Sequence, residues 1–428
     1  MAFWANCSLN KCQPRNMYCL PVVWVLFVLV LGSAVTSCSE TPINTEEKLV
    51  SGGWLGKFVL NDGSYIPFNF YVSDSIITIS NSSEKITSTM SVVGDSIVCS
   101  FPVFGSDLKF KQSSGDHLSG YWHTYKKDRS SVCFVASTSS NPDQRFDHSV
   151  SPAKENFQGK WKVGFNQILG PYGAIGLFEQ FGNVVTGTFL TETGDYRYLQ
   201  GNVISDTLFL SCFDGAHAFL FKAQKSGDSL RGVFYSGNHY LDSSWVAVRN
   251  DSFELRDPYA LTFLKNGETS VSFTLPDVLN DTMVFPSKPY DNKVVILQIF
   301  GSWCPNCKDE SLFLSELYNR YHKDGLEILG VAFESQGSIK ERNKRLLSYS
   351  SSLSLPYRVA VGGGASKAEA SAFFHQLNEV SSFPTCLFID KAGIIRKIHT
   401  GFYGPGTGSY YHKYVKSTTD FVESLLAE

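Results

Sequence analysis

The chain has 428 residues, a length that suggests two or three domains rather than one. Hydrophobic residues make up 43% and charged residues 18%, the balance of a globular protein with enough apolar material for real cores. The formal net charge of −3 argues against a nucleic-acid partner, because no strongly basic segment is present to follow a phosphate backbone. The ten cysteines are too few for a chain of this length to be a disulfide scaffold.

The N-terminal residues have the pattern of an export signal. Residues 21–34 form an apolar run that is short for a membrane-spanning helix. The run leads to Val35-Thr36-Ser37-Cys38, which resembles the lipobox of bacterial lipoproteins. This pattern predicts a signal peptide over 1–37, lipidation of Cys38, and a flexible tether over 38–48. The alternatives are ordinary cleavage without lipidation and an uncleaved anchor helix.

Residues 49 to 250 form a region in which the sequence predicts short antiparallel strands rather than helices. Segments such as Ser75–Ile79 alternate apolar and polar residues, and turn pairs such as Gly115-Asp116 separate them. The high aromatic share of 14% agrees with a large β component, because aromatic side chains suit pleated surfaces. We expect this region to be β-rich throughout.

The same region has the pattern of a duplication. Trp54-Leu55-Gly56-Lys57-Phe58 in a unit over 49–140 corresponds to Trp161-Lys162-Val163-Gly164-Phe165 in a unit over 153–250. We expect two small antiparallel β modules, or two halves of one barrel or sandwich. Such a region could select a partner protein, pair with itself, or hold a catalytic domain away from a membrane.

The last part of the chain, residues 268–428, has an α/β pattern with a pair of cysteines at its centre. Lys293–Phe300 is a buried-strand pattern, and Asp309–His322 has apolar residues at helical spacing. Between them lie Cys304 and Cys307, so the CxxC motif is predicted at a strand-to-helix turn. The free N–H groups and partial positive charge of a helix start stabilise a thiolate. We therefore expect Cys304 to attack a disulfide and Cys307 to resolve the mixed disulfide.

Zinc binding is the structural alternative for a CxxC motif. It would need a second pair of ligands, and Cys386 is the remaining cysteine of this domain. No CxxC or HxxxH pattern accompanies it. The sequence therefore predicts no metal site and no cofactor, and Cys386 is expected to be a buried core thiol, with a third redox partner as the alternative.

Residues of about 271–428 resemble the TlpA/ResA-like branch of the thioredoxin superfamily. The matching features are a Trp-Cys-Pro-x-Cys-Lys run, an acid three residues after the second cysteine, a Phe-Pro-Thr run, and an Ile-Asp-x-x-Gly turn; they are Trp303 to Lys308, Glu310, Phe383 to Thr385, and Ile389 to Gly393. The resemblance implies a thioredoxin-like fold in which Pro384 is cis and faces the CxxC motif. It also implies that Trp303 packs at the surface beside the cysteines.

The resemblance also implies that Glu310 tunes proton transfer near the cysteines. The alternative for Glu310 is a solvated carboxylate on the helix. The sequence departs from thioredoxins at Gln298, which stands six residues before the first cysteine, where thioredoxins carry a buried acid. Glutamine cannot carry a proton, so this departure places more weight on Glu310 or on water.

These patterns predict a multidomain chain with a duplicated antiparallel β-rich region and a C-terminal α/β thioredoxin-like fold. The predicted function is thiol–disulfide exchange in the cell envelope, on the periplasmic side, by a lipid-anchored protein-disulfide reductase. The implied partners are disulfide-containing exported proteins and an upstream membrane electron donor. The alternatives are a peroxiredoxin-like peroxidase, and a binding lipoprotein whose β repeats carry the function.

Overall fold

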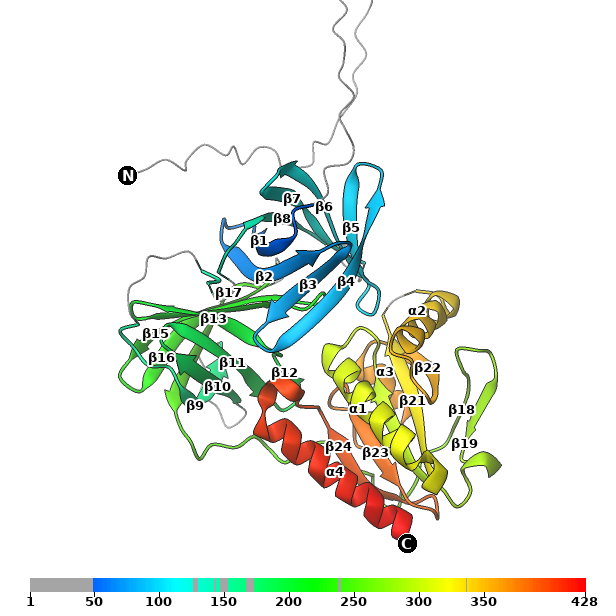
Figure 1. Cartoon of the computed structure of the whole chain (residues 1–428). Helices are drawn as coiled ribbons and strands as arrows, with labels where there is room; N and C mark the ends of the chain where they lie inside the picture. Colours follow the sequence, from blue (N-terminus) through cyan, green and yellow to red (C-terminus); the bar gives the residue numbers. More distant parts are fainter. Residues whose placement is uncertain are drawn as a thin grey trace, which may run out of the picture. The chain divides into compact units, whose positions relative to one another are not determined.

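The computed structural model describes residues 49–125, 130–141, 144–146, 153–166, 173–237, 240–335 and 337–428. The predicted signal peptide, the tether and Cys38 lie outside these described residues. Val50–Glu428 form one compact unit, whose described residues are drawn in colour in Figure 1. Within the described ranges, none of the helices combines the length and the apolar character needed to cross a membrane.

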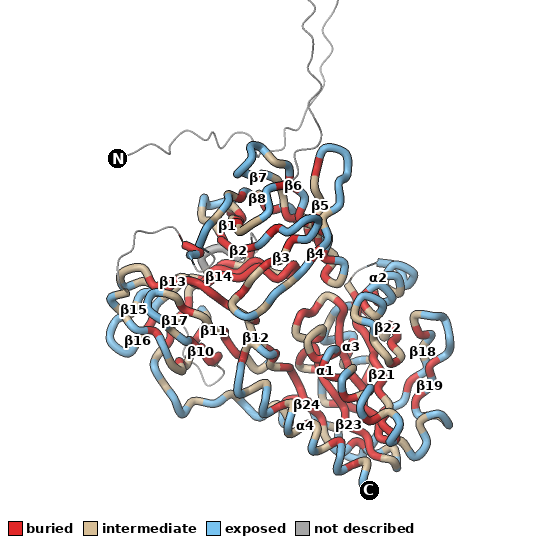
Figure 2. Tube along the Cα trace, viewed as in Figure 1, coloured by how far each residue is buried: buried red, intermediate tan, exposed pale blue. Residues whose placement is uncertain are grey.

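Eight antiparallel strands, paired in chain order, close into the first β unit, a barrel. Its interior is aromatic: the rings of Phe58 and Phe68 lie 4.9 Å apart, and both contact Phe213, which comes from the second sheet. The alternation of buried and exposed residues visible in Figure 2 follows from strands that have one face toward this core. The strands are β1 (Gly52–Val59), β2 (Tyr65–Ser73), β3 (Ile76–Asn81), β4 (Glu84–Val93), β5 (Ser96–Phe101), β6 (Ser106–Ser114), β7 (His117–Thr124) and β8 (Ser131–Thr138).

The second β unit is a nine-stranded sheet in the order β10-β9-β17-β16-β15-β14-β13-β11-β12. Strand β10 also pairs with β11, so this sheet closes on itself as well. Its core includes Phe189, Phe221 and Trp245, all of them buried. The strands are β9 (Gly159–Phe165), β10 (Ala174–Phe181), β11 (Val184–Thr191), β12 (Gly194–Asp195), β13 (Leu199–Ile204), β14 (Thr207–Phe213), β15 (Ala218–Ser226), β16 (Ser229–Ser236) and β17 (Tyr240–Arg249).

The two β units begin in the same way. The indole Nε1 of Trp54 in β1 donates to the carbonyl of Val50 at 3.1 Å, and that of Trp161 in β9 donates to the carbonyl of Phe157 at 2.9 Å. The expectation of a β-rich region is confirmed, and the chain forms two separate sheets rather than two halves of one. The shared tryptophan contact agrees with the predicted duplication, which itself stays a prediction.

The C-terminal part has a five-stranded sheet in the order β22-β21-β20-β23-β24, with helices packed against it. Strands β20, β21 and β22 are parallel, and β23 and β24 run antiparallel to their neighbours. The thioredoxin-like fold is therefore present as expected. The elements are β18 (Phe273–Pro276), β19 (Thr282–Phe285), β20 (Val294–Phe300), α1 (Pro305–Tyr321), β21 (Leu326–Glu334), α2 (Ile339–Ser352), β22 (Arg358–Gly364), α3 (Lys367–Phe373), β23 (Thr385–Ile389), β24 (Ile395–Thr400) and α4 (Ser409–Ala427), with short 3-10 turns at Lys288–Tyr290, His322–Asp324 and Pro405–Thr407.

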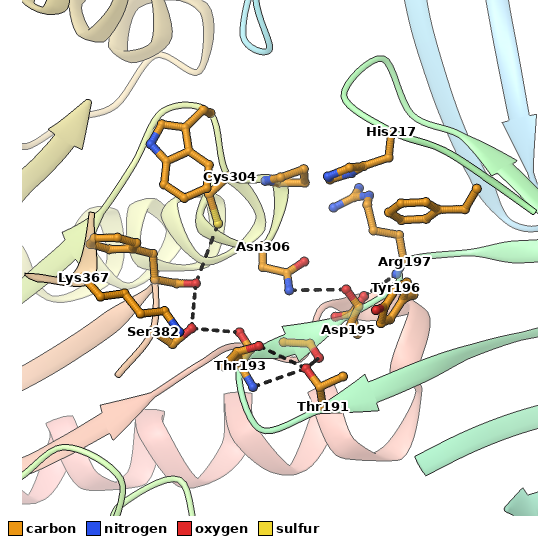
Figure 3. A pocket seen from close by; sticks show the side chains of 15 residues that line it. Thr191, Thr193, Asp195, Tyr196, Arg197, His217, Cys304, Asn306, Lys367 and Ser382 are labelled. Carbon is orange, nitrogen blue, oxygen red and sulfur yellow. Dashed lines mark hydrogen bonds between the residues drawn. The ribbon is translucent and has the colours of Figure 1, made fainter. Parts of the chain in front are cut away.

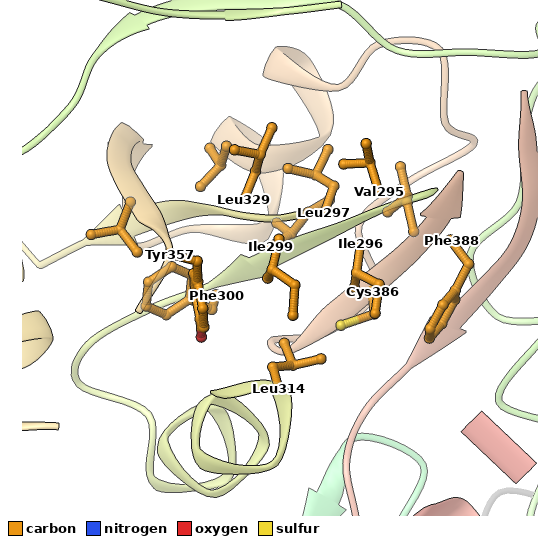
Figure 4. Close-up of a cluster of buried hydrophobic side chains, with 14 of the residues drawn as sticks. Val295, Ile296, Leu297, Ile299, Phe300, Leu314, Leu329, Tyr357, Cys386 and Phe388 are labelled. Atoms are coloured by element: carbon orange, nitrogen blue, oxygen red, sulfur yellow. The ribbon is translucent and has the colours of Figure 1, made fainter. Parts of the chain in front are cut away.

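Strand β20 is the centre of this domain. All seven of its residues are buried, because it has a strand on each side and helices over its faces. Figure 4 shows its side chains packed with Leu314 of α1 and Phe388 of β23. This rigid strand ends at Phe300, four residues before Cys304, so it fixes where helix α1 begins.

A buried arginine ties both β units to helix α1. Arg197, 5% exposed, forms ion pairs with Glu84 of β4, with Asp214 after β14 (Nε to Oδ2, 3.2 Å) and with Asp309 of α1 (Nη1 to Oδ2, 2.6 Å). Removing one partner of such a buried cluster leaves charges without compensation, which is strongly destabilising. The cluster therefore holds the helix that carries the cysteines against the β units.

Candidate active site

The two cysteines of the CxxC motif lie at the N-terminus of α1. Cys304 is the N-cap residue, and its Sγ accepts a hydrogen bond from the backbone N–H of Cys307 at 3.3 Å. Pro305 occupies the first helical turn, where its missing N–H is not needed. Both cysteines are free thiols; Cys304 is 7% exposed and Cys307 is fully buried. Burial raises the pKa of Cys307, and the neighbouring Cys304 raises it further. Cys304 is therefore the sulfur that a substrate can reach first.

The loop that precedes β23 faces these cysteines. The peptide bond between Phe383 and Pro384 is cis, as the resemblance implied. The thiol of Cys304 lies 3.8 Å from the carbonyl oxygen of Phe383, to which it donates. The loop that carries Pro384 therefore meets the CxxC motif at Phe383, the residue directly before the proline. That Pro384 itself faces the cysteines stays a prediction.

Trp303 packs beside the cysteines as expected, and it is partly exposed. Its ring meets the ring of Phe383 edge-on, with centroids 5.8 Å apart, and its indole Nε1 donates to the carbonyl of Phe333 at 2.9 Å. The side chain is half-buried because strand β21 supplies this acceptor. A Cβ on Gly301 would lie 2.3 Å from the indole nitrogen, so the ring also requires glycine there.

Glu310 lies behind Cys307, in the interior of the domain. It is fully buried, so the alternative of a solvated carboxylate is wrong. Gln298 donates to its Oε2 at 2.9 Å and Tyr414 to its Oε1 at 3.3 Å. Burial raises the pKa of Glu310 to about 7, although hydrogen bonds from Gln298, Cys386 and Tyr414 favour the charged form. The carboxyl group can therefore take up or release a proton near neutral pH.

Gln298 and Cys386 complete this buried network. Gln298 also donates to the carbonyl of Cys307, at 3.5 Å, and accepts from Ser311 at 3.1 Å. The thiol of Cys386 is fully buried, and its pKa is raised well above the ordinary value by burial and by Glu310. Cys386 is thus a core thiol, as expected, and it lies against Glu310 rather than at an accessible position.

A second buried acid, Glu334, was not anticipated from the sequence. It ends strand β21, and its carboxylate accepts from the backbone N–H of Ser302 at 2.9 Å and from the Ser302 hydroxyl at 2.8 Å. Burial raises the pKa of Glu334. An acid at the end of a mostly apolar strand is the signal that could have identified it. It fixes the segment directly before Trp303 and Cys304.

A cavity of about 470 Å³ opens beside Cys304, and residues from the second β unit line part of it (Figure 3). The turn that joins β11 to β12 lies against the thioredoxin-like domain. There Ser382 donates to the carbonyl of Thr193 at 3.3 Å, and Asn306 donates to the carbonyl of Asp195 at 3.4 Å. The sequence did not predict this contact, because the two regions are more than 100 residues apart.

A metal site would need several ligand side chains close together. Within those ranges, no three His, Cys, Asp or Glu side chains are grouped so that they could hold a metal ion. What the arrangement provides is an accessible sulfur at a helix start, a buried sulfur one turn later, and a buried carboxyl group that titrates near neutral pH. These are the groups that dithiol–disulfide exchange requires.

Known proteins resemble this part of the chain. The Redoxin family model matches residues 265–411, a range that contains both cysteines. The thiol-disulfide oxidoreductase ResA of Geobacillus thermodenitrificans is 30% identical over 146 residues, which is 33% of this chain and 76% of that protein. The thiol:disulfide interchange protein DsbE of Vibrio cholerae is 24% identical over 147 residues, which is 34% of this chain and 70% of that protein. Among solved structures, a thiol:disulfide interchange protein of the thioredoxin family from Chlorobium tepidum matches with a TM-score of 0.29 and 18% sequence identity. The match covers 37% of this chain and 95% of that protein.

Proposed function

This chain belongs to the family of the ResA thiol-disulfide oxidoreductases, and we propose that it reduces protein disulfides through Cys304 and Cys307. The observation that carries this proposal is the placement of Cys304 at the N-terminus of α1, 3.8 Å from the carbonyl of Phe383. A helix start favours the thiolate that attacks a disulfide. We propose that the backbone of a bound substrate runs beside this carbonyl and the cis-proline loop.

The proposed reaction transfers two electrons. The thiolate of Cys304 attacks one sulfur of the substrate disulfide, and the other substrate sulfur leaves as a thiolate that takes up a proton. Cys307 then loses its proton and attacks the sulfur of Cys304, which releases the second substrate thiol and leaves a Cys304–Cys307 disulfide. A dithiol donor must supply two electrons and two protons to restore the starting state. We propose an upstream membrane protein in this role.

In this scheme Glu310 accepts the proton that Cys307 must lose. The thiol of Cys307 is buried and has a raised pKa, so it needs a base in the interior. Gln298 contacts both the carbonyl of Cys307 and the carboxylate of Glu310, but it is an amide and cannot take the proton. A carboxyl group with a pKa of about 7 is well suited to act as base and acid in the same cycle.

We further propose that the protein works in the cell envelope, anchored by a lipid on Cys38 and facing the periplasm. The apolar run over residues 21–34 and the small residues before Cys38 support this location. Exported proteins with disulfides are then the substrates within reach. Labelling with radioactive palmitate should mark the wild-type chain but not Cys38→Ser, and the variant should leave the membrane fraction; equal labelling of both would contradict the anchor.

The test of the chemistry is the reduction potential of the cysteine pair, measured on the full chain in detergent. A potential near or below about −250 mV, in the range of thioredoxin, supports a reductase, whereas about −120 mV would make the protein an oxidant. Cys307→Ser should accumulate mixed disulfides at Cys304, and Cys304→Ser is the matched control that cannot attack. No reversible two-electron couple at all would rule out the proposal.

A further inference from the structure

The turn between β11 and β12 of the second β unit covers one side of the active site. Besides the contacts of Thr193 with Ser382 and of Asp195 with Asn306, the carboxylate of Asp195 accepts from the backbone N–H of Gly404 at 2.6 Å. The turn therefore touches three separate loops around the cysteines: the cis-proline loop, the CxxC motif and the loop after β24. Figure 3 shows Thr193, Asp195 and Asn306 meeting in this way.

Glycines allow this close approach. At Gly194, where φ is +147°, an added Cβ would lie 1.8 Å from the side-chain nitrogen of Asn306. At Gly401, where φ is +81°, a Cβ would lie 2.9 Å from the carbonyl oxygen of Glu192. At Gly401 the neighbour is backbone, which cannot move aside. At Gly194 the Asn306 side chain would have to turn away and lose its contact, and the positive φ at both positions strains any residue other than glycine. The turn therefore makes a close, specific contact with the loops of the thioredoxin-like domain.

The contact leaves Cys304 accessible through a confined space. The thiol is 7% exposed, and it lines the cavity of about 470 Å³ described above. That volume is within the range of sites for small ligands, roughly 300–1,000 Å³. A cavity of this volume receives only a few side chains. A substrate must therefore bring its disulfide to Cys304 on a narrow segment of chain rather than on a flat surface.

Aromatic side chains form part of the cavity wall on both sides, among polar ones such as Lys367. Tyr196 and Phe219 come from the second β unit, and Trp303 and Phe383 come from the thioredoxin-like domain. His217 stacks on Phe219, with ring centroids 4.7 Å apart. Aromatic walls next to the attacking sulfur favour an apolar or aromatic side chain beside the substrate cysteine, because such a side chain buries its surface there.

From this geometry we propose that the β11–β12 turn makes the second β unit a wall of the substrate site, which selects disulfides on short, flexible polypeptide segments with an apolar residue beside the cysteine. This inference rests on the proposed function, whose exchange chemistry it leaves unchanged. Of the roles that the sequence allowed for the β region, the inference selects the choice of substrate.

The experiment compares substrates and variants of the full chain in detergent. The substrates are a short peptide with one disulfide flanked by phenylalanine, the same peptide flanked by serine, and a folded protein with one exposed disulfide of similar potential. The wild type should reduce the phenylalanine peptide about tenfold faster than either of the others, a discrimination that one apolar pocket provides.

Gly194→Ala should loosen the turn, because its Cβ displaces the Asn306 side chain that contacts Asp195 and because φ of +147° strains alanine. The variant should lower the ratio of the peptide rate to the folded-protein rate at least several-fold. Gly182→Ala is the matched control: it has φ of +60° in a turn of the same sheet, and its Cβ meets no atom within 4 Å. Phe219→Ala is a second, independent variant, which should remove the preference for phenylalanine over serine flanks.

The inference is wrong if the wild type reduces the phenylalanine peptide and the folded protein at equal rates. It is also wrong if Gly194→Ala and Gly182→Ala change the ratio of these two rates equally. If Gly194→Ala does not fold, an unchanged flank preference in Phe219→Ala overturns it instead. Loss of all exchange, with no reversible Cys304–Cys307 couple, is a different result: it refutes the proposed function and, with it, this inference.

Discussion

Replacing Glu310 by glutamine should stabilise the protein at high pH. The side chain is fully buried, and its pKa is raised from the ordinary value of 4.5 to about 7. A folded state with the higher pKa binds the proton more tightly than the unfolded state does, so stability falls as the pH rises from 4.5 to 7 and then levels off. Each pKa unit corresponds to about 1.4 kcal/mol, so the ionised carboxylate costs about 3 kcal/mol above pH 7.

Glutamine fits the site without this penalty. Its carbonyl oxygen can still accept from Gln298, and its amide can face the hydroxyl of Tyr414. Relative to the wild type, Glu310→Gln should therefore become more stable by about 3 kcal/mol between pH 4.5 and pH 8. Glu316→Gln, an exposed position on the same helix, is the control for the loss of a charge.

The difference in unfolding free energy between Glu310→Gln and the wild type can be measured by hydrogen exchange with mass spectrometry. The amides to follow are those of β20, in the sheet against which Glu310 packs. The reduced protein should be used, so that both cysteines remain thiols as they are in the structure. A difference between Glu310→Gln and the wild type that does not change from pH 4.5 to pH 8 would refute the reasoning. So would an equal pH dependence for Glu316→Gln.

Three further outcomes follow from the buried groups. Arg197→Met should lower the free energy of unfolding by about 3–5 kcal/mol in urea denaturation, because it leaves several buried carboxylates without a partner. Lys416→Ala, in an exposed ion pair, should lower it far less. Iodoacetamide at pH 7 should label Cys304 and leave Cys386 unlabelled until the protein unfolds, because burial raises the pKa of the Cys386 thiol; early labelling of Cys386 would contradict its placement. Glu334→Gln should slow disulfide exchange without preventing folding, because one of two hydrogen bonds that fix the CxxC segment is lost, and an unchanged rate would show that this support is unnecessary.

Several parts of the molecule follow from local patterns in the sequence. The run Lys293–Phe300 is apolar and β-branched, and the structure has the buried strand β20 there. The helical spacing after Cys307 predicted α1, and with it the position of Cys304 at a helix start. The burial of Glu310 could also have been predicted, because Phe313, Leu314 and Leu317 repeat on the same face of the helix.

Other features could not be predicted because they join residues far apart in the chain. Arg197 meets Asp309 across 112 positions, and Asn306 meets the carbonyl of Asp195 across 111. Periods of two or 3.6 residues report which face of an element is buried, but not which other element covers it. The closure of the sheets in the two β units and the hydrogen bonds from Ser302 to Glu334 likewise depend on tertiary packing.

The sequence by itself determined the chemistry of this protein: two cysteines at a strand-to-helix turn, followed by a proline before a buried strand. These are local properties, because a helix start and a strand are each specified by residues within a few positions. Only the tertiary structure decided how a substrate reaches that chemistry. The turn around Gly194 lies beside Cys304 because the glycines on both sides permit a contact that no local pattern encodes.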